Sequence, residues 1–191
     1  MSDPVLGQLI EKVGPYRIQY RPPEFSTLVR SIVYQQVSGK AASTIVGRLE
    51  AVAPGLKPSS IVRLSDEELR AVGLSVQKRT YIRDLAEKTL ARRIRFPSLD
   101  LLSDDQVIER LTQVKGIGVW TAHMFLMFAL RRPDVLPVGD LGVRAAIKRA
   151  YGMEAMSAAA DVLRIAQPWR PWASVASWYL WRSLEGPAEL K

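Results

Sequence analysis

The spacing of apolar residues along the chain predicts α-helices almost throughout. In the stretch FSTLVRSIVYQQV, apolar residues recur at steps of three and four, which places them on one stripe of a helix. That stripe consists of Phe25, Leu28, Val29, Ile32, Val33 and Val37. A second helix follows Gly39, with Ala42, Ile45, Val46 and Leu49 on its apolar side. No convincing alternation with a period of two is seen, so strands are not expected.

Helix ends are also marked in the sequence. Ser65 with Glu68 and Ser103 with Gln106 have the spacing of capping boxes, and Gly73 predicts the end of the first of these two helices. Between them, VQKRTYIRDLAEKTLARRI predicts a long helix whose basic face, from Lys78 to Arg95, is a solvated surface or a contact with flanking DNA. Further helices are expected over 118–130, 140–151, 157–166 and 171–184, with prolines at the joints. The prediction is an all-α protein of about ten helices.

Composition narrows the chemistry. The 191 residues suffice for one sizeable core or two small lobes. With no cysteine and one histidine, disulfides, thiol catalysis and cysteine-ligated metal centres are excluded. A net charge of +8 favours a polyanionic partner, although many soluble proteins are basic for colloidal reasons. We find no signal peptide or membrane-spanning run and expect a soluble, cytosolic protein without membrane contacts.

The stretch LTQVKGIGVWTA places two glycines between helical patterns. A turn this short forces the backbone through positive φ, which Gly116 and Gly118 adopt freely. The amides of Gly116, Gly118 and Val119, at the start of a helix, would then form a site for a phosphate. The alternative is a plain helical hairpin with a glycine-rich turn. Asp140 follows Gly118 after 22 residues and opens another helix, where it is also a natural N-cap.

These motifs resemble a known superfamily. LTQVKGIGVWTAHMF followed by DVLPVGDLGVRAAI is similar to the helix-hairpin-helix, Gly/Pro-rich loop and aspartate of the DNA glycosylases. FSTLVRSIVYQQVSGKAA and the PWRPWASVASWYLWRSLEG ending resemble its 3-methyladenine DNA glycosylase II (AlkA-like) branch. The resemblance covers roughly residues 20–186 and implies a two-lobed helical fold with a DNA-binding cleft between the lobes. We expect a single unit over residues 1–191 with approximate lobes 25–110 and 111–191, the N-terminal helix packing on the second, and no β-rich N-terminal domain.

The resemblance implies a reaction as well. A purine alkylated at N3 or N7 is cationic and leaves readily, so the single carboxylate of Asp140 can stabilise the oxocarbenium sugar and position or deprotonate water. Two residues after Gly118, bifunctional members carry a nucleophilic lysine, whereas this chain has Trp120. The expected activity is therefore monofunctional hydrolysis without lyase activity. Lys115 is expected to contact a phosphate.

The base pocket implied by the resemblance contains Trp120 and Trp181, with Met124 and Leu141 where AlkA itself has tyrosines. Trp172 and Trp178 are expected in the core. Gln36 stands where the AlkA-like proteins have an apolar wedge that fills the gap of the flipped nucleotide. His123 is expected to be structural, with contact to the base as the alternative.

The remaining expectations concern partners. No cofactor is needed for catalysis, but relatives hold a monovalent cation, Na⁺ or K⁺, at hairpin carbonyls, here those of Thr112, Val114 and Ile117. The partner is double-stranded DNA with alkylated bases, bound by a monomer in the bacterial nucleoid or a eukaryotic nucleus. Three alternatives stay open: a DNA-binding protein that no longer excises, a helical protein-interaction module, and a glycosylase for another damaged purine.

Overall fold

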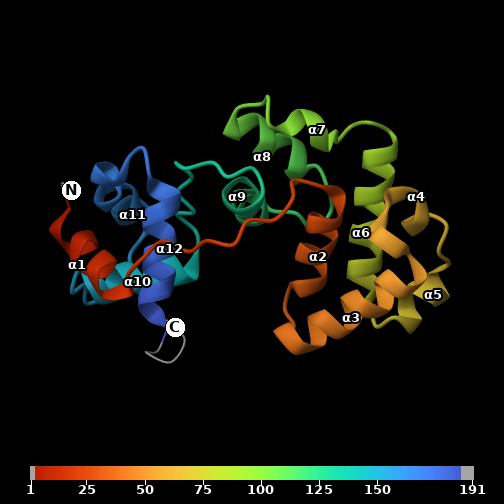
Figure 1. Ribbon diagram of the computed structural model, residues 1–191, viewed down its shortest axis with the longest axis horizontal. Helices are drawn as coiled ribbons and strands as arrows, with labels where there is room; N and C mark the ends of the chain where they lie inside the picture. The colour runs from red at the N-terminus through yellow and green to blue at the C-terminus, as the bar shows by residue number, and fades with distance from the viewer. Residues whose placement is uncertain (1–2, 186–191) are drawn as a thin grey trace. The chain divides into compact units, whose positions relative to one another are not determined.

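All regular structure in residues 3–185, the part of the chain described by the computed structural model, is helical (Figure 1). The all-α prediction is therefore confirmed. The chain divides into two compact units, one formed by residues 21–130 and the other by residues 1–20 together with 131–191.

This division differs from the predicted lobes, because it falls after Leu130 and not near residue 110. The reason is an aromatic chain in the core of the 21–130 unit. Phe125 packs on Phe96 with ring centroids 6.1 Å apart, and Phe96 packs on Phe25 at 6.4 Å. The helix after the glycine hairpin thus shares its core with the helices that precede the hairpin.

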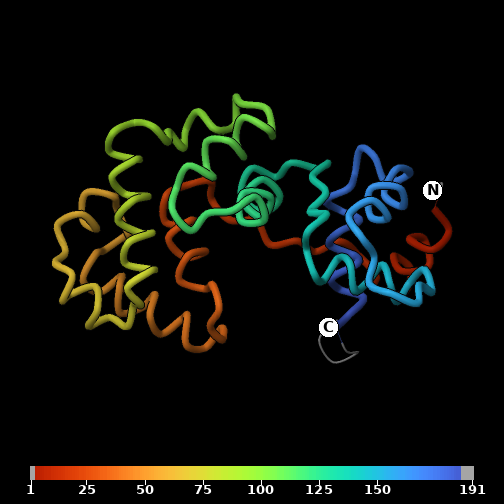
Figure 2. Tube along the Cα trace, turned by 180° about the vertical axis from the view of Figure 1, so that it is seen from behind, coloured from red at the N-terminus to blue at the C-terminus, as the bar shows by residue number. Residues whose placement is uncertain are grey.

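The 21–130 unit contains the α-helices α2 to α9 and one short 3₁₀ helix, η1. They are α2 (Phe25–Tyr34), α3 (Gly39–Val52), η1 (Pro54–Leu56), α4 (Pro58–Ile61), α5 (Asp66–Ala71), α6 (Val76–Leu90), α7 (Phe96–Leu99) and α8 (Asp104–Thr112), followed by α9 (Val119–Phe128). Helix α2 lies alongside α6 in both views (Figures 1 and 2). Leu28, Ile32, Ile82 and Leu85 of these two helices are fully buried.

The predicted apolar stripe is confirmed from Phe25 to Val33, all of it buried, but it does not reach Val37. Helix α2 ends at Tyr34, and the chain turns at Gln36, whose φ is 56°. Val37 is 38% exposed as a result. The predicted stripe is too long by Val37, because the spacing of apolar residues does not indicate the change of chain direction at Gln36.

The two predicted capping boxes and the predicted glycine stop are confirmed, whereas the basic helix ends earlier than predicted. Ser65 with Glu68 and Ser103 with Gln106 form both hydrogen bonds of a capping box. Gly73, at φ 102°, follows α5 as predicted. The long basic helix is α6, and it ends at Leu90 because Arg92 adopts a left-handed conformation with φ 58°.

The second unit contains α1 (Pro4–Val13), α10 (Leu141–Ala150), α11 (Ala159–Ile165), η2 (Gln167–Trp169) and α12 (Ala173–Leu184). Helix α1 packs against α12, as expected for the N-terminal helix, and α10 packs against α12 as well. Leu6 from α1 joins Ile147 from α10 and Leu180 from α12 in one buried cluster. This packing places α10, and with it Asp140 at its start, against α12.

Candidate active site and DNA-binding hairpin

The glycine hairpin joins α8 to α9. Gly116 has a φ of 78°, so positive φ is confirmed there, whereas Gly118 has φ −94° and ψ 176°, an extended conformation that any residue adopts. Gly116 also needs the missing side chain for space, because a Cβ would lie 2.0 Å from Cδ2 of Tyr81 on α6. A Cβ on Gly118 would meet no atom within 4 Å. The first glycine is required by the fold, and the second leaves open space at the start of α9.

The hairpin amides of Lys115 and Ile117 are used within the protein, and three others are not. The N–H of Lys115 donates to Oδ2 of Asp84 at 2.9 Å, so Lys115 can offer a phosphate only its side chain. In residues 3–185, the N–H groups of Gly116, Gly118 and Val119 donate to no other residue, and α9 begins without a side-chain cap. Unsatisfied amides at a helix start favour binding of an anion.

The carbonyls of the hairpin show a similar division. Val114 O accepts from the N–H of Ile117 at 3.1 Å. No donor to Thr112 O or Ile117 O is found within the described chain. Oxygens of this kind are suitable ligands for a hard monovalent cation. Among residues 3–185, no cluster of three or more His, Asp or Glu side chains could hold a metal ion.

Asp140 is the N-cap of α10 and is only 8% exposed. Its Oδ1 accepts a hydrogen bond from the N–H of Val143 at 2.7 Å and another from the indole N–H of Trp181, also at 2.7 Å. The N-cap interpretation is thus confirmed. The geometry also fixes the orientation of the carboxyl group from two sides, by the backbone of α10 and by a side chain of α12.

Trp181 packs closely against α10. A Cβ on Gly142 would lie 2.8 Å from Cδ1 and 3.0 Å from Nε1 of Trp181, so glycine at this position lets the indole reach Asp140. Leu141, next to Asp140, is 69% exposed. Gly142 is not among the predicted site residues, although a glycine in the first turn of a helix, where its propensity is poor, is a signal that the sequence carries.

Trp120 and Met124 lie on α9, in the 21–130 unit, and Trp181 and Leu141 lie in the other unit. Trp120 is 50% exposed, a large exposed fraction for an indole, and Met124 is half-buried. His123 on the same helix is half-buried, and burial lowers its pKa, although Asp104 acts in the opposite direction. The composition of the base pocket stays a prediction.

The two tryptophans assigned to the core behave differently. Trp178 is buried and packs edge-on against Tyr16, as predicted. Trp172 is 58% exposed, so its assignment to the core is wrong. It is the N-cap residue of α12, and its side chain therefore precedes the first turn that packs on the core.

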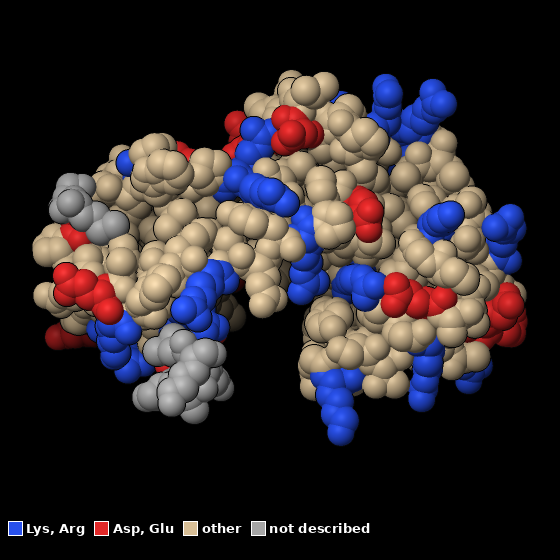
Figure 3. Space-filling view, in the orientation of Figure 1, with Lys and Arg blue, Asp and Glu red and all other residues tan. Residues whose placement is uncertain are grey.

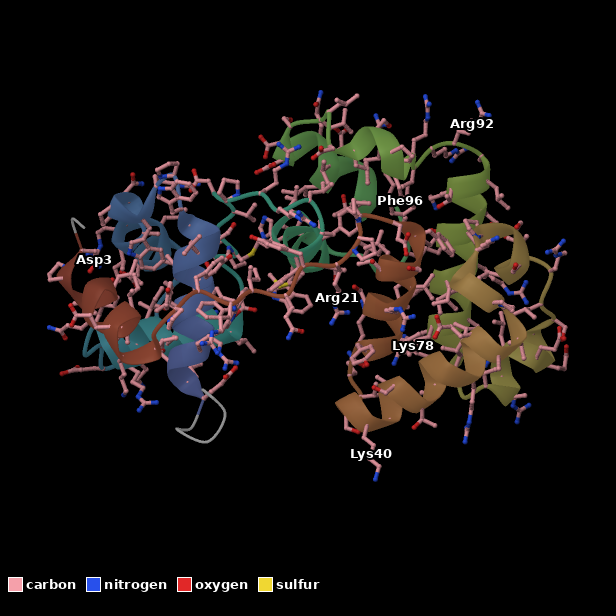
Figure 4. The ribbon with its side chains drawn as sticks, in the orientation of Figure 1. Asp3, Arg21, Lys40, Lys78, Arg92 and Phe96 are labelled. Carbon is pink, nitrogen blue, oxygen red and sulfur yellow. The ribbon has the colours of Figure 1, made fainter. Side chains whose placement is uncertain are left out.

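The basic helix α6 is not a solvated face over its first two turns. The buried Lys78 (labelled in Figure 4) donates through Nζ to the carbonyl of Val33 at 2.7 Å. Arg79 donates to the carboxylate of Asp66 and to the carbonyl of Leu74. Burial lowers the pKa of Lys78. The expectation of a solvated face is wrong here, because these two cations are buried and bind the carbonyls of Val33 and Leu74 and the carboxylate of Asp66.

Elsewhere basic residues are widely distributed. On the face shown in Figure 3, Lys and Arg side chains are spread over several elements, with Asp and Glu among them. Arg92, Arg93 and Arg95 are exposed in the loop beyond α6 (Figure 4 labels Arg92) and form no ion pair within residues 3–185.

No described helix has the length and apolar composition needed to cross a membrane.

Residues 3–185 thus form a helical fold in which a glycine hairpin opens one helix and a buried aspartate caps another, the arrangement expected of the helix-hairpin-helix DNA glycosylase class. The sequence profile of the HhH-GPD superfamily of base excision DNA repair proteins matches residues 29–171. The chain belongs to this superfamily and, within it, to the 3-methyladenine glycosylase branch.

Individual relatives and solved structures support the same branch. The chain is 33% identical over 182 residues to DNA-3-methyladenine glycosylase 1 of Schizosaccharomyces pombe, covering 93% of this chain and 80% of the relative. A crystal structure of a DNA-3-methyladenine glycosidase from Bacillus halodurans superimposes with a TM-score of 0.88 at 43% identity, covering 98% of this chain and 87% of that one. The S. pombe 3-methyladenine DNA glycosylase in complex with abasic DNA gives a TM-score of 0.85 at 31% identity, with 97% and 94% covered.

Proposed function

We propose that this protein is a monofunctional DNA glycosylase that removes alkylated purines, of the 3-methyladenine and 7-methylguanine type, from duplex DNA in base excision repair. The observation that carries the proposal is Asp140, a buried carboxylate held in one orientation at the start of α10 by Val143 and Trp181. The 3-methyladenine glycosylases among its relatives support the substrate class.

The reaction breaks the bond between the sugar C1′ and the purine nitrogen. Alkylation gives the base a positive charge, so the base leaves neutral with the bonding electron pair and needs no proton donor. The negative charge of Asp140 stabilises the oxocarbenium ion that forms on the sugar. Water then adds to C1′ and loses a proton, with Asp140 as the base that positions it or accepts the proton. The products are the free base and an abasic site.

The absence of lyase chemistry follows from the residue two positions after Gly118. Trp120 cannot form a Schiff base with the sugar, which a lysine amine at this position would do. We propose instead that the exposed indole of Trp120 presents its aromatic face to the cationic base, together with Trp181, Met124 and Leu141. The less aromatic composition at Met124 and Leu141 leaves the range of lesions to be measured.

DNA binding is assigned to the hairpin. The amides of Gly116, Gly118 and Val119 bind a backbone phosphate at the start of α9, and the Lys115 side chain adds a charge. A monovalent cation at the carbonyls of Thr112, Val114 and Ile117 would stiffen this turn and take no part in the chemistry. The two carbonyls without a donor, Thr112 and Ile117, support that assignment.

The direct experiment is chromatography of free bases released from DNA treated with a methylating agent, with the DNA strand analysed in parallel. We expect release of 3-methyladenine or 7-methylguanine and strands that stay intact until the abasic sites are cleaved by alkali. Binding to DNA without release of any damaged purine would contradict the proposal and identify a non-catalytic DNA-binding protein. Strand cleavage without alkali would contradict the monofunctional mechanism.

A further inference from the structure

The turn between α2 and α3 has an uncommon backbone. Gln36 adopts φ 56°, a left-handed conformation that costs a residue other than glycine about 1–3 kcal/mol. Its side chain is exposed. A strained conformation of this kind persists only where neighbouring contacts impose it.

Two hydrogen bonds hold the chain just before Gln36, one at Val33 and one at Gln35. The ammonium group of Lys78 on α6 binds the carbonyl of Val33, near the end of α2, at 2.7 Å. The side-chain amide of Gln35 donates to the carbonyl of Gly116 at 2.9 Å. The second bond joins residues 81 positions apart and connects this turn directly to the glycine hairpin.

The hairpin is held by the same face of α6. The ring of Tyr81 lies against Gly116, and the carboxylate of Asp84 accepts the N–H of Lys115 at 2.9 Å. Lys78, Tyr81 and Asp84 follow each other at intervals of three residues, so they form one stripe on α6. Burial opposes ionisation of Asp84, but hydrogen bonds from Lys88 and Lys115 lower its pKa. One helix face therefore supports both turns, and Gln35 connects them.

We propose that Gln35 is a positioning residue that holds the turn carrying Gln36 in register with the phosphate-binding hairpin. The inference rests on the proposed function and adds a coupling to it. When the hairpin binds the backbone phosphate, Gln36 is already placed to enter the base stack as the nucleotide leaves it. Ordering of the turn before binding removes an entropy cost from the flipping step.

The test compares Gln35→Met with Gln77→Met. Methionine keeps the size of glutamine and removes the amide donor, and Gln77 is an exposed residue of α6 whose side chain makes no hydrogen bond within residues 3–185. We expect Gln35→Met to slow single-turnover excision from a fully paired duplex about tenfold, the effect of one lost hydrogen bond. The loss should be small when the lesion is mispaired, because flipping then costs less. Gln77→Met should match the wild type on both substrates.

Binding to undamaged duplex separates this role from that of the hairpin itself. Gln35→Met should bind undamaged DNA within about twofold of the wild type. Gly118→Val, which fits an extended backbone and open space, should weaken that binding because it obstructs the phosphate site. Gln35→Glu, which keeps the shape but cannot donate as a carboxylate, should repeat the excision pattern of Gln35→Met.

A double-mutant cycle with Gln36→Ala tests whether Gln35 acts through its neighbour. We expect the excision rate of the double variant to be no lower than that of the less active single variant, because the two residues serve one step. Losses that multiply, or an equal loss on paired and mispaired lesions, would overturn the positioning role. Wild-type activity in Gln35→Met would overturn it alone, whereas a wild type that releases no base would overturn the proposed function and this inference with it.

Discussion

Two capping aspartates of the second unit, Asp140 and Asp3, use similar contacts. Asp140 caps the start of α10 and accepts the indole N–H of Trp181. Asp3 caps the start of α1 and accepts the indole N–H of Trp169 and the hydroxyl of Tyr151, the residue that follows α10. Both carboxylates are less than 10% exposed.

Their surroundings differ. Asp3 receives four donors, the amides of Val5 and Leu6 on Oδ1 and the two aromatic side chains on Oδ2, so both of its oxygens are used within the protein. Asp140 adjoins Leu141, which is 69% exposed. A capping aspartate with an aromatic donor is therefore not in itself a sign of catalysis. What distinguishes Asp140 is its place beside exposed surface, in a sequence context shared with DNA glycosylases.

The largest effect on stability is expected from Asp3→Ala. It removes a helix cap and leaves the half-buried hydroxyl of Tyr151 and the buried indole N–H of Trp169 without an acceptor, which together cost roughly 3–6 kcal/mol of the free energy of unfolding. Urea denaturation measures this loss. The excision rate per folded molecule should stay within about threefold of the wild type; a much greater fall in rate would remove the contrast between the two aspartates.

The two tryptophans provide a matched pair of smaller changes. Trp181→Phe and Trp169→Phe each remove one indole N–H from a capping aspartate. We expect Trp181→Phe to lower the single-turnover excision rate about tenfold with little change in stability, because the carboxyl group of Asp140 loses one orienting bond. Trp169→Phe should lower stability by about 1–3 kcal/mol and leave the rate unchanged. Equal effects of the two changes on the rate would contradict a positioning role for Trp181.

The smallest effect concerns pH. Burial alone would raise the pKa of Asp3, but hydrogen bonds from Tyr151, Trp169 and two backbone amides lower it below its usual value of 3.8. The native protein then binds fewer protons in this range than the unfolded chain, so this stabilisation is full above pH 3.8 and is lost as the pH falls through the folded-state pKa. The difference in unfolding free energy between the wild type and Asp3→Asn should shrink as the pH is lowered. A constant difference would contradict the cited pKa shift.

Much of the fold could be predicted because its information is local. The capping boxes at Ser65 and Ser103 and the stop at Gly73 depend on neighbouring residues, and the structure forms them as expected. The two-unit division could not be placed correctly, because it depends on Phe125 packing with Phe96 and Phe25, which are far away in the sequence.

The candidate site shows the same limit. Asp140 and Gly116 carry local signals, a helix start and a short turn that requires positive φ. The contacts that orient them come from distant residues, Trp181 for Asp140, and Gln35, Tyr81 and Asp84 for the hairpin. The sequence of α6 likewise predicts a solvated basic face, because the carbonyl groups that bind Lys78 and Arg79 are known only from the structure.

The most direct test of the account is the single-turnover excision rate of Asp140→Asn on methylated duplex DNA, measured beside the wild type. Asparagine keeps an oxygen for the amide of Val143 and the indole of Trp181, so the fold and DNA affinity should be retained. Only the negative charge and the base are lost, and we expect the rate to fall about 10²–10³-fold or more. Excision at the wild-type rate by a folded, DNA-binding Asp140→Asn would show that another group stabilises the transition state.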